Sequence, residues 1–174
     1  MIRPAVYFSV RFFALAFVLA GLLSACTKTP YLIDGEKVGG TPIKLGRLLI
    51  QSTVGQIADT PPGAEMTRFN RILAGTFTNQ MRERLEKASV RVMPERNALL
   101  DATLEVTHAK VLTNRPGAFV GRFQVTLVQE PLRTLLWQGE FTAMGLGSVN
   151  AHAEAGKDLA DGIAIRLIEL GYLR

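Results

Sequence analysis

The chain is poor in the residues that most often carry chemistry. Its 174 residues include one cysteine and two histidines. A single cysteine excludes an internal disulfide. His108 and His152 belong to no HxxxE or HExxH pair, so no metal site is predicted. The serines after residue 26 lie in neither a GxSxG nor an SxxK motif. We therefore predict no catalytic residue, no cofactor and no enzymatic activity.

A hydrophobic run long enough to cross a membrane is also lacking. The longest apolar stretch, Phe12 to Ala25, has 14 residues, whereas a membrane-spanning helix needs about 20. The stretch follows Arg3 and Arg11 and ends in small residues, which is the pattern of a secretory signal peptide. The alternative, an uncleaved anchor with an ordinary thiol at Cys26, is disfavoured by this short length.

The end of the apolar stretch reads Leu23-Ser24-Ala25-Cys26. This tetrapeptide resembles the lipobox of bacterial lipoproteins. The resemblance implies cleavage between Ala25 and Cys26 and attachment of fatty chains, palmitate among them, to Cys26. Two or more such chains anchor a protein stably, whereas one does not. In that family an Asp after the cysteine favours the inner membrane, so Thr27 implies the outer membrane, with the domain facing the periplasm.

The chain has only a small excess of positive charge once the signal peptide is removed. Arg3 and Arg11 leave with it, so the formal charge falls from +5 to +3. A nucleic-acid partner is therefore not expected. A weak attraction to anionic lipid head groups is compatible with this charge.

Proline, glycine and unpatterned charges follow Cys26. They predict a flexible tether up to residue 42. The expected organisation is therefore a signal peptide over 1–25, the lipidated cysteine and tether over 26–42, and one periplasmic domain over 43–174. A domain of this size can bury about two-thirds of its unfolded surface.

Hydrophobic periodicity predicts an α+β domain. Apolar stripes with helical spacing indicate helices over 64–88 and 150–170. Alternating or short apolar segments indicate strands over 43–54, 90–93, 102–112, 119–127 and 135–143. The order is β-α-β-β-β-β-α, and the last three strands form an antiparallel meander. We expect a two-layer sandwich, in which a mostly antiparallel sheet carries two amphipathic helices on one face.

Several polar groups are candidates for chemistry, but each has a simpler interpretation. His108 is in phase with apolar strand residues, so we expect a core or edge histidine bonded to a neighbour. Glu105 and Glu140 lie on polar strand faces; they could meet across strands, but solvated positions are favoured. The Gly145-Leu-Gly147 segment lacks the context of a phosphate loop and is expected to be a flexible corner.

The first helix has an arginine-rich side. It contains Arg68, Arg71, Arg82 and Arg84. Arginine suits phosphate and carboxylate ligands. A solvated helix face with internal pairs, such as Arg82 with Glu86, is the favoured interpretation.

Three apolar residues fall on otherwise polar strand faces: Val120, Val128 and Leu136. If they cluster, they form a patch on the open side of the sheet, and such patches mark contacts with a partner or a lipid. They are the candidate contact residues.

A lipobox before a small helix-over-sheet domain resembles several Gram-negative envelope lipoproteins. They include the lipopolysaccharide-assembly lipoprotein and the auxiliary lipoproteins of ABC-type lipid transport. The resemblance implies a non-enzymatic, membrane-anchored accessory or assembly subunit of an envelope complex, with a protein partner. The alternative is a lipid- or glycolipid-binding carrier. An envelope hydrolase with an unrecognised carboxylate site is a third hypothesis.

Overall fold

The computed structural model describes residues 31–56 and 63–174. The signal peptide and Cys26 lie outside these residues. In chain order the elements are β1 (Tyr31–Val38), β2 (Arg47–Ser52), α2 (Ala64–Lys87), β3 (Arg91–Met93), β4 (Ala102–Arg115), β5 (Ala118–Gln129), β6 (Thr134–Leu146) and α3 (Ala151–Glu169). The α+β class is confirmed, with one strand more than predicted.

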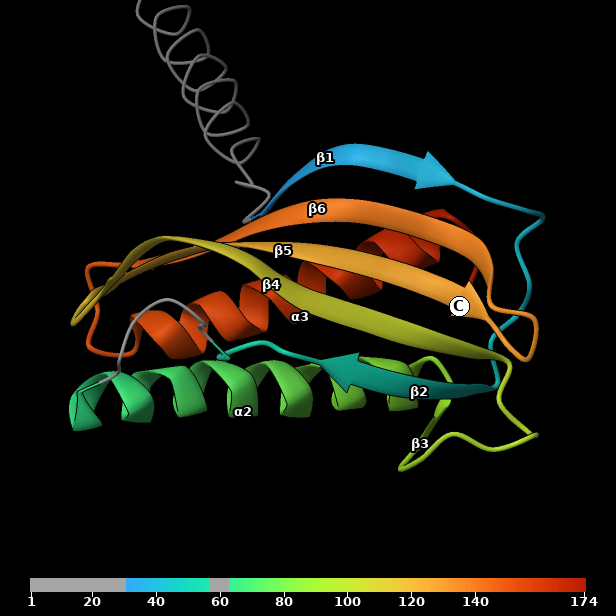
Figure 1. Cartoon of the computed structure of the whole chain (residues 1–174), viewed down its shortest axis with the longest axis horizontal. Coiled ribbons are helices and arrows are strands. Elements are labelled where there is room, and N and C mark those ends of the chain that lie inside the picture. Colours follow the sequence, from blue (N-terminus) through green and yellow to red (C-terminus); the bar gives the residue numbers. More distant parts are fainter. Residues whose placement is uncertain (1–30, 57–62) are drawn as a thin grey trace, which may run out of the picture.

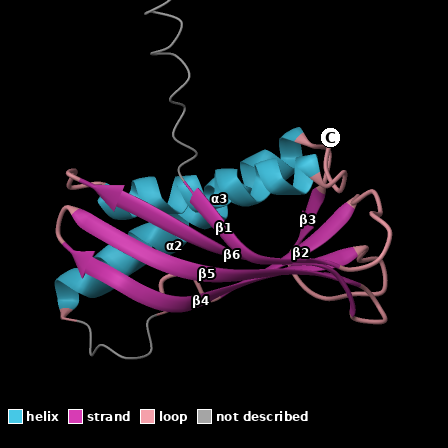
Figure 2. Cartoon of the chain, turned by 90° about the horizontal axis from the view of Figure 1, so that it is seen from above, coloured by secondary structure: helices cyan, strands magenta, loops and turns pink. Residues whose placement is uncertain are grey.

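The strands form one open sheet with two helices on one face (Figure 1). The strand order is β1-β6-β5-β4-β2-β3. The β4-β5-β6 meander is antiparallel, as predicted, and β1 is antiparallel to β6. β2 is parallel to β3 and β4, because the chain crosses over through α2 between them. The second view shows both helices behind the sheet, and none of the described elements covers its other face (Figure 2).

The core lies between the helices and the sheet. One stripe of α2 supplies Leu73, Phe77, Met81 and Leu85, and α3 supplies Leu159, Ile163 and Leu167. Phe123, Trp137 and Phe141 fill the sheet side. Gly156 lets α3 approach α2 closely, since a Cβ there would lie 2.7 Å from the carbonyl oxygen of Leu73. Large side chains therefore fill the space between the helices and the sheet.

The prediction of a flexible tether over 26–42 is wrong for Tyr31–Val38, which form β1. Main-chain pairing with β6 orders this segment, and Tyr31 lies opposite Ala143. The strand could not be recognised from hydrophobic periodicity, because a bulge between Asp34 and Lys37 interrupts the alternation of side chains between the two faces. The signal that could have revealed β1 is the run Tyr31-Leu32-Ile33, whose residue types favour strands.

The Gly145-Leu-Gly147 segment is not a flexible corner. Gly145 lies within β6, and a Cβ there would lie 1.8 Å from the carbonyl oxygen of Ala151. Gly147 makes the turn with a φ of +76°. The first residue of α3 is thus packed directly on the end of β6.

Candidate functional site

The uncovered face of the sheet has a polar centre. Gln124 on β5 lies opposite Thr107 on β4 and Glu140 on β6, and all three point away from the helices because Phe123 and Val125 face the core. Arg122 forms an ion pair with Glu140 at 3.4 Å, and Arg133 binds Glu105 at 2.7 Å. Both glutamates considered as chemical candidates are thus bound to arginines, and exposed amide and hydroxyl groups lie between the two pairs.

The two carboxylates considered for acid–base chemistry do not meet. Glu105 lies opposite Thr126 on β5, and Thr126 lies opposite Gln138 on β6, so β5 separates Glu105 from the strand that carries Glu140. Each glutamate has its own arginine partner. This arrangement does not give the closely spaced pair of carboxylates that glycoside hydrolases use.

The predicted patch of Val120, Val128 and Leu136 does not form. Leu136 belongs to the core, because a register shift between β5 and β6 near Leu127 places both Leu136 and its neighbour Trp137 inside. Such an irregularity interrupts the alternation that placed Leu136 on the open face. Val128 is buried in a row with Thr103. Val120 is partly exposed near the other end of β5.

A carboxylate is enclosed near Val128. Glu130 accepts a hydrogen bond from the Thr103 hydroxyl at 2.7 Å, and its side chain is 6% exposed. Arg96 and Arg133 lie 3.4 and 3.6 Å from it. Two guanidinium groups and a hydroxyl satisfy this carboxylate, so it holds the β5–β6 turn against β4.

Both histidines lie at the opposite end of the sheet, in a cluster of aromatic and amide side chains. His152 on α3 is buried, stacks on Phe69 at 4.9 Å between ring centres, and places Nε2 2.8 Å from Oδ1 of Asn114. The Asn114 amide in turn donates to Oδ1 of Asn70 at 3.3 Å. Burial lowers the pKa of His152. The cluster joins α2, α3 and β4, and Asn70 and Asn114 had no sequence motif to reveal them.

His108 differs from the prediction. It stacks on Phe123 with ring centres 4.5 Å apart, but neither ring nitrogen has a hydrogen-bond partner among the described residues. Burial lowers the pKa of His108 to about 4, so the ring is neutral at pH 7. Gly121 makes room for it, because a Cβ there would lie 3.1 Å from His108 Nε2. A neutral, stacked ring of this kind acts as an apolar packing group.

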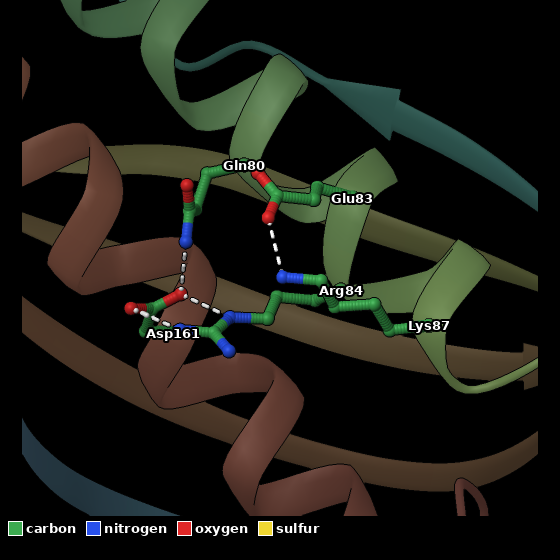
Figure 3. A network of polar contacts seen from close by, with 5 residues as sticks. All are labelled: Gln80, Glu83, Arg84, Lys87 and Asp161. Atoms are coloured by element: carbon green, nitrogen blue, oxygen red, sulfur yellow. Dashed lines mark hydrogen bonds and ion pairs between the residues drawn. The ribbon is translucent and has the colours of Figure 1, made fainter.

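The four arginines on one side of α2 differ in their contacts. Arg84 binds Asp161 of α3 through Nε and Nη2, at 2.7 and 2.9 Å, and the amide of Gln80 donates to the same carboxylate (Figure 3). The internal pair of this helix joins Glu83 to Lys87. Arg68, Arg71 and Arg82 are exposed. Arg84 is therefore a helix–helix contact and not part of a phosphate site.

The described residues line surface grooves at both ends of the domain. One, of about 400 Å³, lies between Gly55 and α2 and is lined by Thr67, Asn70 and Arg71 among others. The other, of about 350 Å³, lies at the opposite end beside Lys44, Asp101 and Tyr172. Among the described residues no group of His, Cys, Asp and Glu is placed to hold a metal ion. In the same ranges no helix is long and apolar enough to cross a membrane.

No family model matches the chain. No curated protein matches it either. Similar solved structures include the PelC dodecamer from Paraburkholderia phytofirmans, at 14% identity over 74% of this chain and 96% of that chain, with a TM-score of 0.41. Protein XCC0632 from Xanthomonas campestris has 13% identity, covers 78% and 94% of the two chains, and gives a TM-score of 0.47.

A third structure, lipoprotein GNA1162 from Neisseria meningitidis, has 17% identity, covers 71% of this chain and 99% of that chain, and gives a TM-score of 0.38. Similarity at this level assigns neither a family nor a function to the chain.

Proposed function

We propose that this chain is a non-enzymatic lipoprotein, fastened to the outer membrane through Cys26, that acts in the periplasm as an accessory or assembly subunit of an envelope complex. The observation that carries the proposal is the Leu23-Ser24-Ala25-Cys26 sequence, placed four residues before the first strand of a folded domain. A protein partner is supported by the polar face of the sheet around Gln124, which the two helices leave uncovered.

The lipid-carrier hypothesis ranks lower, because large side chains fill the interior. Phe77 of α2 and Phe141 of β6 both belong to the packed core. The hydrolase hypothesis ranks lower because Glu105 and Glu140 are separated and paired with arginines.

Lipidation is tested by metabolic labelling of the full-length protein with palmitate. We expect label in the membrane fraction, and loss of label in a Cys26→Ala variant. A matched Ser24→Ala variant keeps the cysteine and a small residue before it, so it should remain labelled. An exported wild-type protein that is unlabelled would overturn the anchoring.

Partner binding is tested by photo-crosslinking in whole cells. A photoreactive residue at Gln124 lies on the uncovered face, and the control at Arg82 is exposed on α2 on the other side of the domain. We expect one discrete adduct from position 124 and none from position 82. If position 124 gives no adduct in a lipidated, folded protein, the accessory-subunit role is wrong even though the anchor stands.

A further inference from the structure

Exposed apolar side chains gather where β6 ends. Met144 and Leu146 are 44% and 59% exposed, and Val149 in the following turn is 83% exposed. Met144 lies directly opposite Val120 on β5, and cross-strand partners share a face. Leu112, at a bulge of β4 beside the Thr113–Val120 pair, is also exposed. We call Leu112, Val120, Met144, Leu146 and Val149 the end surface.

The end surface adjoins the point where the described chain begins. Tyr31 lies opposite Ala143, the residue before Met144. Four residues separate Cys26 from Tyr31, and that length of chain spans at most about 18 Å when fully extended. The opposite end of the sheet, at the turn that carries Leu132, is farther from Ala143 by about 30 Å at the usual rise of a strand. The segment that joins the domain to Cys26 therefore begins at the same end of the domain as the end surface, and the far turn lies at the other end.

Basic residues surround the end surface. Lys110 and Arg115 are exposed on β4 on either side of Leu112, and neither forms an ion pair with a described residue. Asn114 bonds to Asn70 of α2, which brings the first turns of α2 to the same end. Those turns add the exposed Arg68 and Arg71 against the acidic Glu65. Apolar side chains framed by unpaired cations match a surface of acyl chains and anionic phosphate head groups.

We propose that the end surface rests on the bilayer that holds Cys26, with Met144, Leu146 and Val149 at the depth of the lipid head groups. The inference rests on the lipidation proposed above. The protein would then contact the bilayer in two ways. The acyl chains attach it to the membrane, and the end surface sets the orientation of the domain. Gln124 points to the same side of the sheet as Val120 but lies about 13 Å farther along β5 from the bilayer, which leaves the polar centre open to a partner.

The test uses mature lipidated protein in vesicles of phosphatidylethanolamine and phosphatidylglycerol. Because Cys26 is the only cysteine and its sulfur is consumed by lipid, an introduced cysteine is the only free thiol. A nitroxide at Leu146→Cys is compared with one at Leu132→Cys, an exposed leucine at the other end. We expect the label at 146 to collide with oxygen more than with a water-soluble nickel complex, and the label at 132 to do the reverse.

Equal access of the nickel complex to both labels would overturn the inference. Labelling at Val149→Cys repeats the measurement outside any strand, so the test survives if the 146 variant does not fold; an aqueous label at 149 would likewise contradict it. The wild-type protein is treated with the same reagent. If wild type takes up nitroxide, Cys26 is free and the proposed anchoring has failed, which is a separate result.

Discussion

Glu36 on β1 and Arg166 on α3 are joined by a two-point ion pair. Arg166 Nε lies 2.7 Å from Glu36 Oε1, and Nη2 lies 2.6 Å from Oε2. The indole of Trp137 donates to the same carboxylate at 2.6 Å. The first strand after the anchor is thereby fixed to the last helix and to the core, although 130 positions separate Glu36 from Arg166.

Replacing Glu36 should therefore loosen the strand nearest the membrane. We expect Glu36→Gln to lower the free energy of unfolding by about 1 kcal/mol, because it weakens the bonds that this carboxylate accepts from Arg166 and Trp137. It should also speed amide exchange in β1. The control is Glu169→Gln, whose exposed side chain accepts a hydrogen bond from Nη1 of the same Arg166. Equal exchange in β1 for both variants would contradict the prediction. The measurements are chemical denaturation and hydrogen exchange.

The same pair predicts a pH effect. Hydrogen bonds from Arg166 lower the pKa of Glu36 in the folded state, in spite of partial burial. Its contribution is therefore complete above the unfolded pKa near 4.5 and is lost as the pH falls through the lower, folded value. In Glu36→Gln this part of the acid sensitivity should be absent, as read from unfolding midpoints between neutral and acidic pH.

His108 predicts a second loss of stability at a higher pH. Its folded pKa of about 4 lies below the value of 6.5 for a free side chain. The unfolded chain therefore binds the proton first, and stability falls as the pH drops from 6.5 towards 4. With allowance for partial solvent screening we expect a loss of about 1–2 kcal/mol. In a plot of the unfolding free energy against pH, His108→Phe should reduce the loss between pH 6.5 and 4. A matched His152→Phe variant should in addition lose the hydrogen bond to Asn114.

Two glycines should respond oppositely to alanine. At Gly145 the added methyl group would collide with the main chain of Ala151, so Gly145→Ala should destabilise the protein by about 3 kcal/mol. At Gly75, within α2, a Cβ meets nothing within 4 Å. Gly75→Ala should therefore stabilise the helix by about 0.5–1 kcal/mol. Thermal unfolding of the two variants decides the matter, and a stabilising Gly145→Ala would show that the turn rearranges.

The contact between the helices offers a further comparison. Asp161→Asn weakens the bonds from both Arg84 and Gln80 (Figure 3) and should cost about 1 kcal/mol. Glu83→Gln removes the exposed pair with Lys87 and should cost clearly less than Asp161→Asn, because solvent screens that pair. Denaturant titration of both variants measures the difference. Similar losses would mean that the α2–α3 ion pair adds little to the packing around Gly156.

Periodicity alone determined the larger part of this architecture. The stripe from Leu73 to Leu85 and the alternation in the meander identify their elements, because a buried face needs apolar residues at the helical or strand spacing. The predicted location at the membrane likewise rests on a local pattern, Leu23-Ser24-Ala25-Cys26. It stays a prediction until lipid attached to Cys26 is detected.

Only the tertiary structure decided what depends on register and on partners far apart in the chain. β1 exists because β6 offers an edge and Arg166 offers a charge, and neither is visible near Glu36 in the sequence. Leu136 turns inward because of a register shift, which moves a side chain to the other face without any change in composition. Met144 and Val120 become neighbours through the same pairing, so the end surface could not be recognised from either segment alone.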